Sequence, residues 1–334
     1  MYELIGICLA LASLLALNAC ALIFAAAIWR VAASRTSGRH AAARERLLFT
    51  LRALPPALAT LFVFALVVPA YILNEPTHTD ETVGVKLLFL AAASAAGVFL
   101  ALKRVSATWW ATRRLARGWM RQAEPVAIRG VTIPAYRIRH YFPVIAVVGV
   151  LRPRLFLAAQ VFDALADDEL AAALAHERRH VEARDNLKRA LLQAGQDALL
   201  FVPVGRALVR AWQQESELAA DEFAASQGAT YALNLASAII KISRLIPAGA
   251  RPSLPGGAHL LGAEEDGLSR RVLNLLRLAA PDSSAGAAEN STARTLPATA
   301  LRLSLCAAFL FVITRPDVLK ITYSAIEQVV ARLR

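Results

Sequence analysis

The segment Leu4–Trp29 contains no charged residue, and its length constrains the fold of this chain more than any other feature. A helix of this length can cross the roughly 30 Å of hydrocarbon in a bilayer. A cleaved signal peptide is the alternative, but no basic segment precedes the run, and the run is longer than a typical signal core. The chain is also 57% hydrophobic, with a mean hydropathy of +0.47. We therefore expect an integral membrane protein whose first span is Leu4–Trp29.

Three further apolar stretches are candidates for membrane spans. Ala53–Leu73 is long enough to cross, and Pro69 is expected to kink it. Thr82–Leu102 is a third candidate. Pro297–Thr314 is shorter, and it spans the bilayer only if Arg302 reaches the inner interface. These stretches predict four transmembrane helices.

The charges between these spans are distributed unevenly. Arginines crowd the first connection, the connection Asn74–Lys86 carries three acids against one lysine, and a basic segment without acids follows the third span. By the positive-inside rule, the N-terminus lies outside and the chain after Leu102 is cytosolic, in a bacterial-type inner (plasma) membrane. The basic residues are Arg30, Arg35, Arg39, Arg44, Arg46 and Arg52 before the second span, and Lys103, Arg104, Arg113, Arg114, Arg117 and Arg121 after the third.

The net charge of +12 lies largely in these two flanks. Basic clusters beside spans indicate orientation and contact with anionic lipid headgroups, so we expect the lipid bilayer as a partner and no direct nucleic-acid binding. Lys103–Arg121, which also carries three tryptophans, is either an interfacial helix or the solvated end of the third span.

The stretch Leu170–Asn186 contains the pattern His-Glu-x-x-His at His176, Glu177 and His180. It is rich in Ala and Leu without Pro or Gly, so we expect a helix, and a spacing of four places both imidazoles one turn apart on one face. Two such imidazoles can bind one zinc ion. Glu177 can then reach a water on the metal and take its proton, which is the chemistry of a zinc peptidase.

A second acidic pattern lies downstream, in the Ala-rich helical segment ESELAADEFAAS. Glu217 would complete a His-His-Glu ligand set and leave a position open for water. Asp221, one turn further on, would hold the far nitrogen of a ligand histidine. The alternative is that these acids form the solvated face of a surface helix, which is a weaker interpretation beside the histidine motif.

These motifs and their order resemble the BlaR/MecR-type antirepressor membrane metallopeptidases, which are gluzincin-like. The similarity covers about half of the chain, and its specific part is the metal motifs. It is carried by the segments GVLRPRLFLA (149–158), ADDELAAALAHERRHVEARDN (166–186), FVPVGRALVRAW (201–212), ESELAADEFA (215–224) and LSRRVLNLL (268–276).

The resemblance implies a role for each matching residue. His176, His180 and Glu217 correspond to the three ligands of one Zn²⁺ ion, and Glu177 corresponds to the general base. Asp221 is the acid of the family's ExxxD motif. Asp185, followed by Asn186, matches a family Asp-Asn pair beside the second histidine, so a supporting role is implied for Asp185. Ala166, where the family has a Ser-like cap, and Val202-Pro203, where it has Asn-Pro, depart from the pattern outside the metal site.

The expected fold is a mainly α membrane protein with an α+β zincin-type cytosolic metallopeptidase domain inserted between the third and fourth transmembrane helices. The expected parts are residues 1–121 with three spans, 122–296 with the peptidase, and 297–334 with the fourth span and a short tail. The resembling family continues into an extracellular penicillin sensor. This chain stops after the fourth span, so we expect any signal to enter through the membrane helices or a separate partner.

Short β-like segments are expected at the start of the domain, at Pro125–Ile133, Tyr136–Phe142, Val144–Val150 and Leu155–Ala158. Either of the last two is a candidate edge for holding a substrate backbone, although a core strand without such a role is an equal alternative. Ala190–Trp212 is apolar but interrupted by polar residues, Gly and Pro. We interpret it as a helical hairpin packed on the metal helix, because a single crossing would separate the two metal motifs.

Three functions from different classes are compatible with this sequence. The first is a membrane zinc endopeptidase that cleaves a protein substrate, which the resemblance implies to be a transcriptional repressor. The second is an HtpX-like quality-control protease, and the third is a non-catalytic signalling or scaffold protein. Glu177 argues against the third, because a structural zinc site needs no base. The oligomeric state stays open, with a homodimer among the alternatives.

Overall fold

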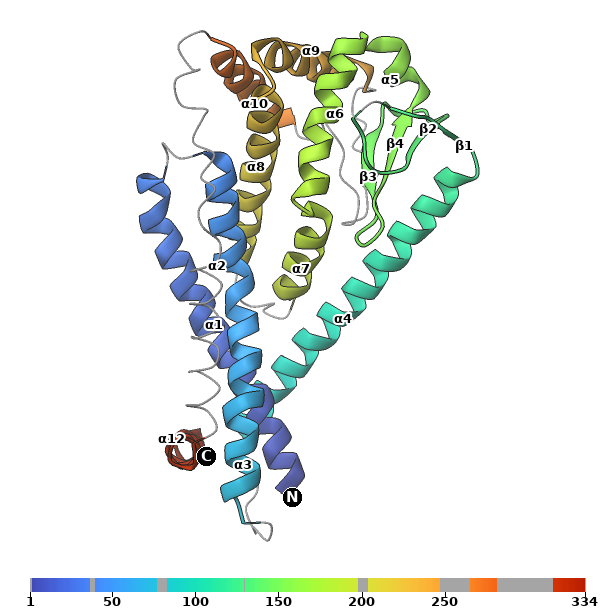
Figure 1. Cartoon of the computed structure of the whole chain (residues 1–334). Coiled ribbons are helices and arrows are strands. Elements are labelled where there is room, and N and C mark those ends of the chain that lie inside the picture. The colour runs from blue at the N-terminus through green and yellow to red at the C-terminus, as the bar shows by residue number, and fades with distance from the viewer. Residues whose placement is uncertain are drawn as a thin grey trace.

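The computed structural model describes residues 2–36, 40–76, 83–128, 130–197, 204–246, 265–280 and 315–333. The expected fourth span, Pro297–Thr314, lies outside the described residues. The seven segments form a mostly helical protein with one small sheet (Figure 1).

Three helices are long and apolar enough to cross a membrane: α1 (Tyr2–Arg35), the continuous helical path Ala41–Asn74, and α4 (Val85–Met120). They contain the first two expected spans, and α4 contains the third, Thr82–Leu102, from Val85 onward. The N-terminus, the end of α3 and the start of α4 lie at one end of these helices, and the end of α1 and the start of α2 lie at the other end with the sheet (Figure 1). Large apolar side chains such as Phe24, Phe64 and Phe89 are exposed on the helices, as lipid-facing residues are.

The path Ala41–Asn74 consists of α2 (Ala41–Phe62), the π-helical turn η1 (Val63–Val67) and α3 (Val68–Asn74). The wide turn comes directly before Pro69, where the sequence predicts a kink. Proline has no N–H to donate, and its ring crowds the carbonyl four residues earlier, so a π-turn relieves the contact.

Helix α4 continues without a break through the basic segment Lys103–Arg121 as far as Met120. The basic segment is therefore the solvated end of the third helix, one of the two alternatives left open by the sequence. The helix leans away from α1 and α2 (Figure 1). Its last turn packs on the sheet, where the ring of Trp119 lies 5.2 Å from that of Phe156.

The sheet has four strands in the order β1-β2-β4-β3. They are β1 (Ala123–Pro125), β2 (Ala135–Ile138), β3 (Ile145–Val148) and β4 (Arg154–Ala158). Strands β2 and β4 run parallel, whereas β1 pairs antiparallel with β2, and β3 pairs antiparallel with β4. Gly149, with φ +116, begins the turn between β3 and β4, where an added Cβ would lie 2.6 Å from the carbonyl oxygen of Arg152.

The expectation of a strand over Pro125–Ile133 is wrong. Strand β1 ends at Pro125, and the chain then turns at Gly130, which has φ +83. The N–H of Val131 bonds the carbonyl of Ile128, 3.3 Å away, instead of a neighbouring strand. The β-branched residues of this segment pack against the core from a loop.

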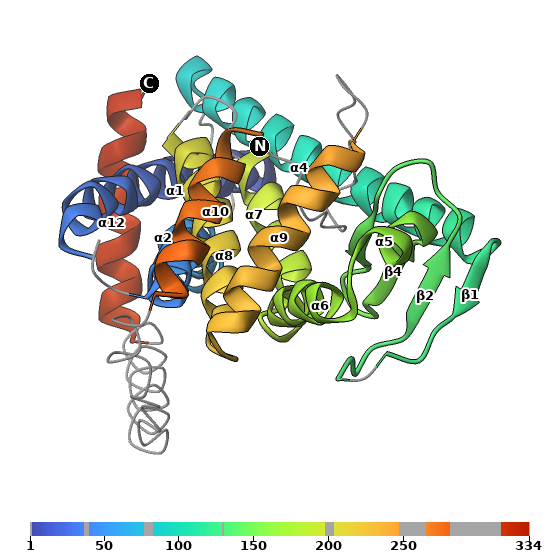
Figure 2. The same cartoon turned by 90° about the horizontal axis from the view of Figure 1, so that it is seen from above.

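Seven helices follow the sheet in the described residues: α5 (Ala159–Ala164), α6 (Asp167–Glu182), α7 (Asp185–Asp197), α8 (Val204–Ala225), α9 (Ala229–Leu245), α10 (Glu265–Leu278) and α12 (Pro316–Leu333). Helix α6 lies between the sheet and the pair α8 and α9, and α10 lies beyond them (Figure 2). The core of the domain is formed by the sheet, α6 and α9.

Helices α7 and α8 form the hairpin expected over Ala190–Trp212, with residues 198–203 outside the described part. Both helices pack along α2. A Cβ added at Gly195 would lie 3.1 Å from Arg52 Nη1, and one at Gly205 would lie 3.3 Å from Arg52 Nε. Both helices thus lie close to the path Ala41–Asn74, and α8 also packs against α6, so the two metal motifs meet.

Candidate metal centre

The centre lies mainly on α6. Residues of the first turn stabilise the start of this helix. The carboxylate of Glu169 accepts a hydrogen bond from the N–H of Ala166 at 2.9 Å, which is half of a capping box. Three acids, Asp167, Asp168 and Glu169, occupy the first turn, where they interact favourably with the helix dipole. Two turns later, the apolar surroundings bury His176 and His180 to 0% and 4% exposure.

The structure brings the three expected ligands together. Nε2 of His176 lies 3.2 Å from Nε2 of His180. Glu217, on α8, has its Oε2 3.7 Å from Nε2 of His176 and its Oε1 3.8 Å from Nε2 of His180. Two donors bound tetrahedrally at about 2.0–2.1 Å from one zinc ion lie roughly 3.3 Å apart. The nitrogen and oxygen donors therefore fit a tetrahedral metal ion, and all three lie within 4.8 Å of one another.

The far nitrogen of each histidine faces a buried carboxylate. Nδ1 of His180 hydrogen bonds to Asp185 Oδ2 at 2.7 Å, and Nδ1 of His176 lies 2.9 Å from Asp221 Oδ1. Ser216, next to Glu217 on α8, donates to the same oxygen of Asp185 at 2.9 Å. Such carboxylates fix the ring orientation and leave Nε2 as the ligand atom. Asp221 and Asp185 therefore lie where the sequence predicts supporting residues.

Arg271 of α10 is a part of the site that the motifs did not indicate. Its guanidinium donates to both oxygens of Asp221, at 2.9 and 2.7 Å, and Nη1 lies 3.1 Å from Glu217. It belongs to the segment 268–276 that carries part of the family resemblance. Beyond that segment, the sequence showed only an arginine in an amphipathic helical pattern, next to another arginine, which is too common to single out.

These contacts shift the pKa values of the buried groups. Burial lowers the pKa of His176, but the carboxylates of Asp221 and Glu217 outweigh it and raise the pKa to about 9. Burial raises the pKa of Asp221, yet Arg271 and His176 hold it below its usual value. Asp185 is likewise held low by His180 and Lys188, against the effect of burial. The pairs around the ligands are therefore charge-compensated.

Glu177 differs from these carboxylates because it is buried without a partner. It is 1% exposed, and neither of its oxygens has a hydrogen-bond partner among the described residues. Burial is the first cause of its raised pKa, against the nearby His180 and His176, which lower it. A raised carboxylate pKa suits a general base that operates near neutral pH.

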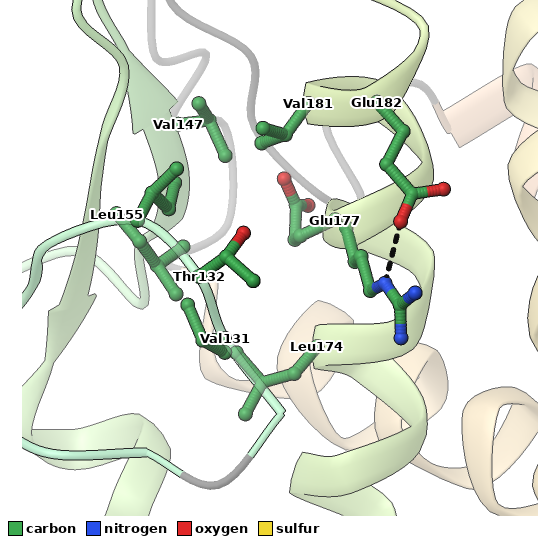
Figure 3. Close-up of a pocket in the computed structure, with 10 residues that line it drawn as sticks. Val131, Thr132, Val147, Leu155, Leu174, Glu177, Val181 and Glu182 are labelled. Carbon is green, nitrogen blue, oxygen red and sulfur yellow. Dashed lines mark hydrogen bonds and ion pairs between the residues drawn. The ribbon is translucent and has the colours of Figure 1, made fainter.

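Glu177 also points into a pocket between α6 and the sheet (Figure 3). The empty space in the pocket, including its open side, is about 320 Å³. The wall opposite α6 consists of mostly apolar residues from β3, β4 and the loop before β2, namely Val131, Thr132, Ile133, Val147 and Leu155. Leu174 and Val181 line the pocket from α6.

Strand β3 is the outer strand of the sheet on the side of α6. The hydrogen bond from Ala158 N to Val144 O fixes the register, so the polar groups of Ile145 and Val147 face away from β4. The side-chain amide of Asn186 donates to Val147 O at 3.0 Å and to Gly149 O at 3.1 Å. Of the two candidate edges, the central strand β4 is excluded, because β2 and β3 flank it.

A comparison with models of protein families finds a match over residues 22–275, to the family described as BlaR1 peptidase M56. The match covers more than half of the chain and includes all residues of the centre described above. A comparison with curated proteins finds no match.

Proposed function

Because the chain belongs to the BlaR1 peptidase M56 family, we propose that it is an integral membrane zinc endopeptidase that hydrolyses peptide bonds in a protein substrate. One observation carries this proposal: the closest approaches among the ligand groups of His176, His180 and Glu217 are 3.2–3.8 Å, beside a buried Glu177 whose oxygens have no hydrogen-bond partner in the described residues. The family supports a membrane metallopeptidase, and the geometry supports the roles of the individual residues.

His176, His180 and Glu217 would hold one Zn²⁺ ion. Two imidazoles and a carboxylate suit zinc better than magnesium or calcium, which prefer oxygen ligands. A zinc ion with three protein ligands and an open position polarises a carbonyl and acidifies water. Asp185 and Asp221 keep each ligand histidine in the Nε2-binding orientation, and Arg271 holds Asp221 in turn.

Glu177 is the general base. Its carboxylate takes the proton from the attacking water and delivers it to the leaving amine. Burial keeps it free of bulk water, and both oxygens lack a hydrogen-bond partner in the part of the chain that the structure describes. The scaffold alternative gives this residue no role, because a structural site needs no base and closes its fourth position with another ligand.

The substrate backbone would pair with the edge of β3 that faces away from β4, beside the metal helix, where no described strand pairs with it. Ile145 and Val147 point backbone groups to that edge, and Asn186 occupies Val147 O. Both residues are buried, at 0% and 3% exposure, so substrate pairing would require this edge to open. The apolar pocket beside Glu177 would then take an apolar side chain next to the scissile bond (Figure 3).

Regulatory proteolysis on the cytosolic side is the setting that we propose. The arginine-rich end of α1 and start of α2 lie at the same end of the membrane helices as the sheet (Figure 1), and the positive-inside rule assigns such a basic end to the cytosol. A cytosolic site fits a soluble protein substrate, and the family resemblance favours a transcriptional repressor over the general substrates of an HtpX-like protease.

The test is cleavage of a defined library of unstructured peptides by full-length protein in detergent, with cleavage sites read by mass spectrometry. Glu177→Gln should retain zinc and lose at least about 100-fold in rate, because only the base is removed. Glu124→Gln on β1 is the matched control, since its exposed side chain lies away from the site, and it should cleave normally. If Glu177→Gln cleaved as fast as wild type, the proposed mechanism would be wrong.

A further inference from the structure

A buried glutamate of the membrane path contacts the helices that carry the metal centre. Glu45 lies on the first turns of α2 and is 0% exposed. Its carboxylate accepts from Arg179 Nη2 at 2.8 Å and from Lys188 Nζ at 2.5 Å. Arg179 precedes His180 on α6, and Lys188 lies on the first turn of α7. One carboxylate therefore joins α2 to both helices.

Lys188 connects Glu45 to His180, one of the proposed metal ligands, through Asp185. Lys188 Nζ also donates to Asp185 Oδ1 at 3.1 Å, and Asp185 Oδ2 bonds His180 Nδ1 at 2.7 Å. Asp185 and His180 are 2% and 4% exposed, so solvent does not replace these bonds. A continuous line of charged side chains thus runs from Glu45 to the imidazole of His180.

Two further contacts place the same end of α2 against α8. Arg44 Nη2 lies 2.8 Å from Glu215, two residues before Glu217. The N–H of Ala41 donates to Glu222 at 2.9 Å. Residues next to the centre on α6, α7 and α8 therefore all contact the first one and a half turns of α2. Helix α2 then continues into the apolar part of the helical path Ala41–Asn74.

We propose that Glu45 is a positioning residue through which membrane helix α2 sets the orientation of His180, by way of Lys188 and Asp185. This inference rests on the proposed function, in which His180 is a metal ligand. Lysine has a flexible stem and a strongly hydrated ammonium group, and the side chain of Lys188 is 19% exposed. Without Glu45, Lys188 turns toward solvent, Asp185 loses one of its partners, and the His180 ring is held less firmly.

The test compares zinc affinity and the absorption spectrum of the cobalt-substituted protein among full-length variants in detergent. Glu45→Gln should weaken zinc binding several-fold, less than the roughly 10–100-fold cost of losing a direct partner of a metal ligand, because Lys188 and Asp185 stand between Glu45 and His180, and it should change the cobalt spectrum. Glu169→Gln is the matched control. It removes a buried carboxylate that accepts from Lys241 and Ser237 but leads to no ligand, so it should lower stability and leave the spectrum unchanged.

A double-variant cycle tests the route. If Glu45 acts through Lys188, adding Glu45→Gln to Lys188→Met should weaken zinc binding no further than Lys188→Met alone. Fully additive effects would overturn the inference. Should Glu45→Gln fail to accumulate as folded protein, Lys188→Met alone must show the zinc and spectral changes, and a wild-type spectrum would overturn the inference.

The two proposals fail in different ways. Wild-type protein that binds no zinc would contradict the proposed function and this inference together. Wild-type protein that binds zinc, with a Glu45→Gln variant of equal affinity and unchanged spectrum, would contradict this inference alone.

Discussion

Arg271 donates two hydrogen bonds to Asp221, one to each carboxylate oxygen, although 50 residues separate them in the chain. Both side chains are buried, and Asp221 lies against His176. Arg271→Gln leaves this carboxylate without its charged partner, so we expect a loss of about 3 kcal/mol in the free energy of unfolding. Arg271→Lys should also lose stability, because an ammonium group cannot donate to both oxygens in the same geometry.

Chemical unfolding of the full-length protein checks this prediction. Arg270→Gln is the control, since Arg270 is exposed on the same helix, and its stability should stay within about 0.5 kcal/mol of wild type. Equal stability of the Arg271 and Arg270 variants would show that the buried pair does not hold α10 to the centre.

The raised pKa of His176 predicts how the metal-free protein responds to pH. Its pKa rises from 6.5 to about 9 on folding, so the protonated ring stabilises the fold fully below pH 6.5. This contribution is lost as pH rises through about 9. The thermal midpoint of chelator-treated protein should therefore fall between pH 6.5 and 9.

Asp221→Asn tests the cause of that fall. It removes the carboxylate that raises the pKa of His176, so the slope in this pH window should flatten. A midpoint that is constant or rises with pH in wild type would rule out a protonated His176 in the metal-free fold.

Asn186, on α7, contacts the proposed substrate strand β3, because its amide donates to the carbonyl oxygens of Val147 and Gly149. Asn186→Ala should raise KM several-fold by loosening the edge of β3, with zinc content unchanged. Asn186→Asp should be worse, because it directs a carboxylate at two carbonyl oxygens. Steady-state kinetics with a peptide that the wild-type protein cleaves would measure this change in KM. Gln160→Ala is the control, because it removes a similar hydrogen bond from a side-chain amide to His140 O. An unchanged KM in both Asn186 variants would argue against β3 as the substrate strand.

The start of α6 offers a stabilising substitution. Ala166 occupies the N-cap without a side-chain acceptor, while Glu169 already bonds its N–H. Ala166→Ser should add about 0.5–1 kcal/mol by completing the capping box. Ala171→Ser, at an exposed interior position of the same helix, should instead cost a few tenths of a kcal/mol. The measurement is the thermal midpoint of each variant, and Ala166→Ser should have the higher one. A higher midpoint for Ala171→Ser would contradict the assignment of Ala166 as the N-cap.

The sequence was sufficient to predict the features that depend on local pattern. Uninterrupted apolar length indicated the first three membrane helices, and helical spacing placed His176 and His180 on one face. The second motif supplied Glu217 and Asp221, and these lie beside the histidines in the structure. The β-branched segment Pro125–Ile133 was misinterpreted, since Gly130 turns the chain before a strand can form.

Contacts between distant segments were not predictable from one sequence. Arg271 reaches Asp221 across 50 residues, and Glu45 reaches Lys188 across 143. Each is a charged residue on an amphipathic helix, and nothing in its neighbours distinguishes it from a solvated one. The packing of α2 and α10 around the centre decides which charges are buried, and that packing depends on the whole fold.

The zinc content of purified full-length protein, measured for wild type beside Glu217→Ala, tests the central claim most directly. The account predicts about one zinc ion per wild-type chain and its loss in Glu217→Ala, because three ligands from two helices converge on one point. Glu215→Ala removes a carboxylate of the same helix that faces Arg44, and it should retain zinc. A wild-type chain that binds no zinc after incubation with the metal, or a Glu217→Ala variant that binds it as tightly, would contradict the account.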